Sequence, residues 1–195
     1  IQSIVGLTTI NSGDGSDIIN VGSNATLGAT ATDDTNSGGN VNAIAALLTL
    51  NGGANTSGTG DVVNVDETGE TVGNTGFLTS TRIWDLGMPD STETLNGITY
   101  GTLEFLNINL GLGADTFNVR SAHAGQTKVE GRDSDDTFNV GSQAPALDGV
   151  LDGVAGLLIL DAGNGSDYLN VDDSGDADKN LGKLTGTCLT GLGMG

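Results

Sequence analysis

Residues 11–21 read NSGDGSDIINV: a polar turn with two glycines and two aspartates, followed by an apolar segment that closes on Asn-Val. Glycine permits left-handed turn conformations, and aspartate supplies oxygen atoms that cap the backbone or bind cations. Beyond Asp17, the side chains of Ile19 and Val21 share one parity and therefore point to the same face of a strand. The stretch predicts a turn that leads directly into a half-buried β-strand.

The same ending recurs four more times along the chain. The further copies are GTGDVVNV (58–65), GLGADTFNV (111–119), RDSDDTFNV (132–140) and GNGSDYLNV (163–171). Each copy keeps a large apolar residue two places before its final valine, on the inward parity. Recurrence of this kind is typical of repeat proteins, in which each unit buries its apolar face against its neighbours.

The chain also contains a longer repeat that spans several of these short copies. Residues 65–88 align without a gap on residues 171–194, and the same residue type occurs at Val65, Asp66, Gly69, Asn74, Gly76, Leu78, Thr79, Thr81, Leu86, Gly87 and Met88. The offset is 119 residues upstream (139 − 20) but 106 residues here (171 − 65). The first copy therefore carries insertions, which the alignment puts near 32–40 and 54–58.

These offsets divide the chain into two repeat cells. Residues 1–119 are expected to form a first complete cell, and residues 120–195 a second, truncated cell that continues directly from the first. The part missing from the second cell corresponds to residues 97–119. The sequence is thus expected to be a slice of a longer tandem array.

The spacing of apolar residues favours strands over helices. The chain contains 33 glycines, and apolar residues alternate, as in Leu106, Ile108 and Leu110. Short strands separated by Gly, Asn, Asp and Ser turns predict an all-β fold. Most strands are too short to bury themselves alone, so we expect a parallel right-handed β-helix, or β-solenoid, with irregular loop insertions.

The charge balance limits the partners. With 25 acids against 6 bases, the net charge is −19, which argues against nucleic acid and anionic membranes and favours cations. No segment approaches the ~18 apolar residues of a membrane span, so no membrane insertion is expected. The lone Cys188 has no partner for an internal disulfide and aligns with Arg82, so we interpret it as an incidental small residue.

The turns resemble a known calcium-binding motif. Residues 12–20, 110–118 and 162–170 look like degenerate copies of Gly-Gly-x-Gly-x-Asp-x-apolar-x, the nonapeptide of the RTX family of secreted bacterial proteins. In that family, calcium binds between adjacent turns of a parallel β-roll. Nearly the whole chain also resembles the Gly/Asp-rich (GxGxD...NV) repeat arrays of very large secreted bacterial surface proteins.

This resemblance implies a set of metal ligands. The sixth-position ligands would be Asp17, Asp61, Asp115, Asp136 and Asp167, and the third-position helpers would be Asp14, Asp133 and Asn164. Family repeats follow every nine residues, whereas the Asn-Val markers here are irregularly spaced. Only the 21-residue step from Asn118 to Asn139 predicts directly stacked turns, which would pair Asp115 with Asp136.

Alternative interpretations of the polar residues stay open. Asp and Asn in glycine turns often cap their own backbone without any metal, although stacked acidic turns ~4.8 Å apart repel one another unless a cation intervenes. The five Asn-Val asparagines either form a hydrogen-bonded ladder or lie separately on the solvent face. Their irregular spacing favours the second interpretation.

No enzymatic activity is expected. The acidic cluster at Asp172, Asp173 and Asp176 has a counterpart at 66–70, and duplication in both cells favours a repeated structural turn or cation site over catalysis. The single His123 lacks a nucleophile context. Trp84 and Tyr100 could form a carbohydrate platform, but Trp84 aligns with a threonine.

The sequence therefore favours a structural role outside the cell. We expect a rigid, calcium-assisted rod or fibre on a bacterial surface, whose partners are copies of itself or adjoining repeats end to end. The alternative is an adhesin-type module that contacts glycans, surfaces or neighbouring cells through loops 24–42, 51–60 and 88–97.

Overall fold

The computed structural model describes residues 1–25, 37–55, 60–89 and 96–195. Every regular element in these ranges is a strand, which confirms the all-β prediction. No helix in them has the length and apolar character needed to cross a membrane. The loops 24–42, 51–60 and 88–97 lie partly outside the described residues.

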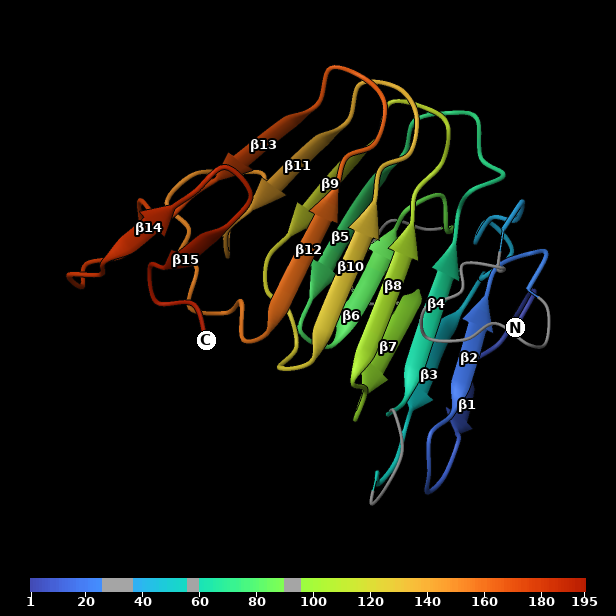
Figure 1. Cartoon of the computed structure of the whole chain (residues 1–195). Coiled ribbons are helices and arrows are strands. Elements are labelled where there is room, and N and C mark those ends of the chain that lie inside the picture. The colour runs from blue at the N-terminus through green and yellow to red at the C-terminus, as the bar shows by residue number, and fades with distance from the viewer. Residues whose placement is uncertain (26–36, 56–59, 90–95) are drawn as a thin grey trace.

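The strands form two sheets and one separate hairpin (Figure 1). The large sheet contains, in spatial order, β1 (Thr8–Asn11), β3 (Leu47–Asn51), β7 (Gly97–Gly101), β6 (Arg82–Asp85), β5 (Thr75–Thr79), β9 (Thr116–Val119), β11 (Thr137–Val140) and β13 (Tyr168–Val171). The small sheet contains β12 (Leu157–Asp161), β10 (Gln126–Glu130), β8 (Phe105–Asn109), β4 (Val62–Asp66) and β2 (Ile18–Val21). The hairpin pairs β14 (Gly182–Leu184) with β15 (Leu189–Gly191).

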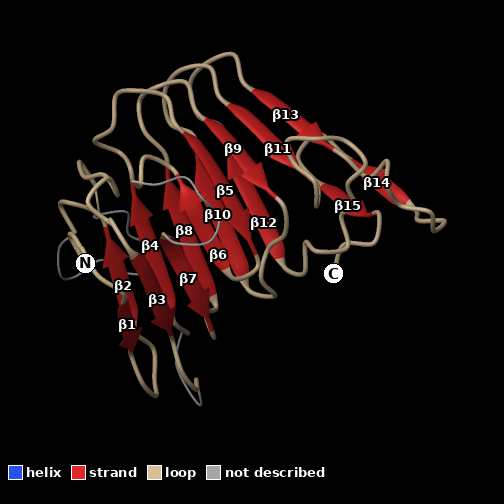
Figure 2. Cartoon of the chain, turned by 180° about the vertical axis from the view of Figure 1, so that it is seen from behind, coloured by secondary structure: helices blue, strands red, loops and turns tan. Residues whose placement is uncertain are grey.

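The two sheets form facing layers, and the view from behind shows the same arrangement (Figure 2). Along the chain, β1 to β4 alternate between the large and the small sheet, and β7 to β13 do the same. The inward parity predicted from the repeats is confirmed for the pairs Val63/Val65 and Phe117/Val119, which are buried in the core between the layers. Apolar residues at alternate strand positions therefore hold the two sheets together.

The prediction of a single parallel β-helix or β-solenoid is wrong. The large sheet is mixed, because β6 runs antiparallel to both β5 and β7. Three consecutive strands, β5 to β7, stay in this sheet without a crossing to the small one, and β14–β15 is a further antiparallel pair outside both sheets. The fold is better described as a two-sheet, sandwich-like all-β arrangement.

A tight hairpin causes this departure. In the segment 75–85, Thr79 pairs with Arg82, so that only Ser80 and Thr81 join the two strands. Two apolar-alternating runs separated by two residues are typical of a β-hairpin. Residues 75–85 lie within the stretch that aligns with the second cell. The alignment therefore assigned them to the solenoid repeat and did not predict a hairpin.

Candidate functional site: the aspartate rows

All five predicted sixth-position aspartates occupy the same local position. Each one is the residue immediately before a strand, and in chain order these residues are Asp17, Asp61, Asp115, Asp136 and Asp167. Because the strands that follow them are paired in parallel and in register, the aspartates fall into two rows across the strand direction. The short row contains Asp17 and Asp61 beside the small sheet, and the long row contains the other three beside the large sheet.

Backbone-to-carboxylate hydrogen bonds connect the members of each row. In the long row, the N–H of Asp115 donates to Asp136 Oδ1 (2.8 Å), and the N–H of Asp136 donates to Asp167 Oδ1 (2.9 Å). In the short row, the N–H of Asp17 donates to Asp61 Oδ1 (2.8 Å). The predicted proximity of Asp115 and Asp136 is thus confirmed. In each of these contacts the carboxylate caps the neighbouring turn, which neither sequence interpretation specified.

The long row extends one step further towards β5. The N–H of Asn74, the residue before β5, donates to Asp115 Oδ1 (2.7 Å), and Gly111 N–H donates to Asp115 Oδ2 (3.1 Å). Both oxygens of Asp115 are therefore occupied by backbone donors. An aspartate in this position satisfies strand-start N–H groups that a sheet ladder leaves open.

The predicted third-position helpers lie at the surface. Asp133 and Asn164 form an isolated parallel bridge, and Asn164 Nδ2 donates to Asp133 Oδ1 (2.9 Å). Both are exposed, as is Asp14 in the turn before β2. The pair Asp133 and Asn164 therefore connects two successive turns through a polar contact of its own.

Burial raises the pKa values of two aspartates in the long row. Asp115 is 3% exposed and Asp136 is 0% exposed. Burial raises the pKa of Asp136 to about 6; the hydrogen bond from Asp115 N–H opposes the shift, and the charges of neighbouring carboxylates increase it. Burial likewise raises the pKa of Asp115, against its two backbone hydrogen bonds. Two close, buried carboxylates favour a proton or a cation between them.

Two carboxylate oxygens in the rows are buried without a hydrogen-bond partner. Among the described residues, these atoms are Asp17 Oδ2 and Asp136 Oδ2. A buried, unpaired carboxylate oxygen is costly unless a proton or cation satisfies it. No three His, Cys, Asp or Glu side chains in the described parts of the chain gather into a geometry for a metal ion. Calcium, which takes six to eight oxygen ligands, stays a prediction at these rows.

The acidic clusters at 66–70 and 172–176 each hold a distant backbone segment through hydrogen bonds to a carboxylate. Asp66 Oδ2 accepts from Gly39 N–H (2.9 Å), and Asp172 Oδ2 accepts from Gly149 N–H (2.6 Å) in the matching position. Each also accepts, through Oδ1, from a hydroxyl two residues later. A repeated structural turn therefore accounts for this duplicated cluster.

Glu67, in the first of these two clusters, has a strongly raised pKa. It is 1% exposed, and its Oε1 accepts a hydrogen bond from Val41 N–H. Burial raises the pKa of Glu67 to about 8, and nearby carboxylates act in the same direction, against the hydrogen bond from Val41. Glu67 is thus protonated in the folded protein near neutral pH.

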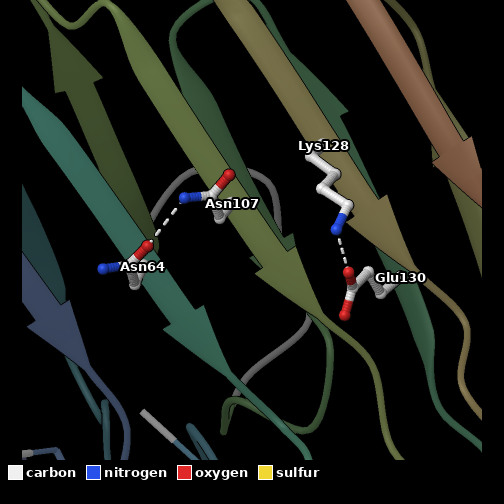
Figure 3. A network of polar contacts seen from close by, with 4 residues as sticks. All are labelled: Asn64, Asn107, Lys128 and Glu130. Atoms are coloured by element: carbon white, nitrogen blue, oxygen red, sulfur yellow. Dashed lines mark hydrogen bonds and ion pairs between the residues drawn. The ribbon is translucent and has the colours of Figure 1, made fainter. Parts of the chain in front are cut away.

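The asparagines form ladders, so the favoured interpretation of separate solvent-facing side chains is wrong. In the small sheet, Asn64 Nδ2 donates to Asn20 Oδ1 at 2.8 Å. Asn107 Nδ2 donates to Asn64 Oδ1, also at 2.8 Å (Figure 3). In the large sheet, Asn139 Nδ2 donates to Asn118 Oδ1 and Asn170 Nδ2 to Asn139 Oδ1, both at 2.9 Å. Irregular chain spacing did not prevent the ladders, because loops of different length return the strands to the same register.

The sequence pattern did not include Asn107 among the repeated asparagines, because Asn107 is followed by Ile108 and not by a valine. The position after it in the small sheet is Lys128, which pairs with Asn107 in register and forms an ion pair with Glu130 on the same strand (Figure 3). The lysine ends the small-sheet ladder. Both side chains of this ion pair are partly exposed, so it contributes little to stability.

The aromatic residues of the possible carbohydrate platform are buried. Trp84 stacks on Phe77 with ring centroids 5.1 Å apart, and the guanidinium of Arg120 lies 5.5 Å from the Trp84 ring. Tyr100 Oη donates to the Thr79 carbonyl (2.5 Å) and its ring meets His123 edge-on. Burial lowers the pKa of His123. These side chains are packed into the structure and do not form an open aromatic surface.

Comparisons of this chain with protein-family models, with curated proteins and with solved structures found no match. Inferences about function therefore rest on the sequence and on the geometry described above.

Proposed function

We propose that this protein is a structural module of an extracellular bacterial scaffold or fibre, in which calcium assists the aspartate rows. The observation that carries the proposal is the set of polar rows that cross the strands. Asparagine ladders and aspartate caps each connect one strand to the next in register. Such rows are typical of proteins whose stability is built up by repetition.

The calcium component is supported by the electrostatics of the long row. Asp136 combines complete burial, a raised pKa and an oxygen without a partner among the described residues. A divalent cation at this oxygen would relieve both the desolvation and the repulsion from the neighbouring aspartates. The net charge of −19 makes the whole surface attractive to cations.

Thermal unfolding in excess calcium and in chelator tests this proposal. Calcium at 100 times its Kd would raise the Tm of a chain of this size by about 5 to 10 °C. Asp136→Asn keeps the Oδ1 acceptor for Asp115 N–H but removes the charge, so it is expected to lose most of the calcium shift. Asp178→Asn removes an exposed charge and serves as the matched control.

The three proteins together show whether calcium binds at the long row or has no effect on stability. A calcium shift in the wild type and in Asp178→Asn, but not in Asp136→Asn, supports cation binding at the long row. The absence of a shift in all three proteins contradicts the calcium component and leaves the aspartates with their capping role alone. The adhesin alternative depends on loops that lie partly outside the described residues, and no contact described above favours it.

A further inference from the structure

The β12–β13 end of the molecule exposes large apolar side chains, among them Leu169 and Val171, which have the inward parity of the repeat. Tyr168 is 65% exposed, Leu169 is 59% exposed and Val171 is 40% exposed. A hollow of about 570 Å³ opens between these two strands and the hairpin β14–β15, lined by the side chains of Leu158, Leu160 and Leu169. Exposed apolar area on edge strands favours the addition of further strands.

The first repeat cell shows what covers the same positions. Val63 and Val65, which the repeat alignment matches to Leu169 and Val171, are both 0% exposed. Leu78 is 0% exposed, whereas its counterpart Leu184 is 78% exposed. The difference lies in what covers each cell and not in residue type.

Two strands cover the first cell. β7 pairs with β3, which places Ile98 beside Leu48, and β8 pairs with β4, which places Leu106 beside Val63. The counterparts of β3 and β4 in the second cell are β12 and β13, because IAALLTLN (44–51) matches VAGLLILD (154–161). In the described structure, β12 and β13 are the outermost strands at this end of their sheets.

The two cells exchange sheets. β3 belongs to the large sheet and β12 to the small sheet, whereas β4 belongs to the small sheet and β13 to the large sheet. A strand like β7 would therefore extend the small sheet beside β12, and a strand like β8 would extend the large sheet beside β13. The hollow between β12 and β13 would then receive the inward side chains of both.

A polar contact fixes the register of the added strand. Asn170 is the last member of the large-sheet ladder, and Asn64 holds the equivalent position in the first cell. Asn64 Oδ1 accepts from Asn107 Nδ2 at 2.8 Å. An asparagine at the Asn107 position of an incoming strand would donate to Asn170 Oδ1 in the same way, which discriminates against a register shifted by one residue.

We propose that the β12–β13 end is a docking face for two parallel strands with the pattern of residues 97–109, presented by a further repeat cell of the same kind. This proposal rests on the proposed function of a scaffold module. It identifies the partner as a further repeat cell, whose strands would extend both sheets. The strands bind by sheet addition on both layers at once, with apolar residues filling the hollow and asparagine setting the register.

The test uses a fluorescent synthetic peptide with the sequence of residues 97–119, titrated into the whole chain in calcium and in chelator. Saturable binding with a Kd of about 1–100 µM is expected. Amide hydrogen exchange at β12 and β13 should slow on binding. A peptide in which Ser replaces Leu106 and Ile108 should bind at least about tenfold more weakly, because it lacks the side chains that fill the hollow.

Two protein variants locate the binding. Leu169→Asp changes an exposed side chain on the proposed face and should weaken binding about tenfold or more. Leu7→Asp is the matched control, because Leu7 is 83% exposed and directly precedes β1, at the opposite edge of the large sheet. It should leave the affinity unchanged.

Three results would overturn the proposal: no saturable binding, equal binding by Leu169→Asp, or self-association of the chain alone that protects β12 and β13. If Leu7→Asp abolishes this self-association, the β12–β13 end of one copy binds the β1 edge of a second copy. Failure of peptide binding while calcium still stabilises the chain removes the docking proposal only. Binding without any calcium effect removes only the calcium component of the proposed function.

Discussion

The backbone N–H of Asp115 donates to the carboxylate of Asp136 on the neighbouring strand start, at 2.8 Å, although the two residues are 21 positions apart. The same contact recurs from Asp136 to Asp167, across 31 positions. The side chains therefore tie successive turns together whatever the length of chain between them. The carboxylate acts first as a cap, and any cation adds to that role.

The capping role predicts a difference between two substitutions at one site. Asp136→Ala leaves the N–H of Asp115 without its acceptor and should lower the free energy of unfolding by about 1–3 kcal/mol. Asp136→Asn keeps the acceptor and removes a buried charge, so its stability in chelator should equal or exceed that of the wild type. Urea unfolding at pH 7.5 measures both. Equal losses for Ala and Asn would show that the charge, and not the cap, is what matters.

The buried Glu67 predicts a pH dependence of stability. Its pKa is about 8 in the folded protein, against an ordinary value of 4.5 for the unfolded chain, so between these values the folded protein binds more protons than the unfolded chain. The free energy of unfolding therefore falls as pH rises, by about 1.4 kcal/mol per pH unit from this group in the middle of the window. The contribution is complete below pH 4.5 and lost above pH 8.

Glu67→Gln isolates this contribution, because it mimics the protonated acid and keeps an oxygen for Val41 N–H. Subtracting its stability from that of the wild type at pH 6.0, 7.0 and 8.0 cancels His123, whose lowered pKa acts with the opposite sign below pH 6.5. The difference should grow in favour of Gln as pH rises. A difference that is constant with pH would contradict protonation of Glu67.

The asparagine ladders predict a dependence on position. Asn64 is 4% exposed and takes part in two ladder hydrogen bonds, whereas Asn170 is exposed and takes part in one. Asn64→Ala should cost about 1–3 kcal/mol, because it removes a buried side chain and two ladder hydrogen bonds to the partly buried Asn20 and Asn107. Asn170→Ala should cost under about 1 kcal/mol, since water replaces the lost contact. Chemical unfolding of the two variants gives the comparison.

Close packing against the long row predicts that Gly131 tolerates no side chain. A Cβ at this position would lie 2.4 Å from Asp136 Oδ2 and 2.4 Å from the Ala162 carbonyl oxygen. Gly131→Ala should therefore destabilise the protein by about 1–3 kcal/mol. At Gly101, the only atom of the described residues within 4 Å of a new Cβ is Asn51 Oδ1, 3.9 Å away. Gly101→Ala is the control and should be near neutral; a similar loss in both variants would refute the packing argument.

Local features were predictable from the sequence because they depend on parity and turn chemistry. The inward faces of Val63/Val65 and Phe117/Val119 followed from alternation, and the contact of Asp115 with Asp136 followed from one regular spacing. Chain spacing could not predict the other rows. Asp17 reaches Asp61 across 44 residues because the chain between them contributes β3 to the large sheet and then returns to the small sheet in register.

The arrangement of the strands was not predictable from the repeat alone. The hairpin at Ser80 and Thr81 keeps three consecutive strands in one sheet. From β3 to its counterpart β12 the chain crosses between the sheets seven times, an odd number, so equivalent strands of the two cells fall in opposite sheets. A solenoid prediction assumes that every turn adds one strand to each layer. One two-residue turn is sufficient to break that assumption.

Native-state amide hydrogen exchange, measured in calcium and in chelator, tests most directly whether the aspartate rows hold the scaffold together. The amides of Asp115 and Asp136 donate to the next carboxylate in the row, so they should exchange only through global unfolding, and more slowly in calcium. Rapid exchange of these two amides in both conditions, with the strand amides still protected, would contradict the account.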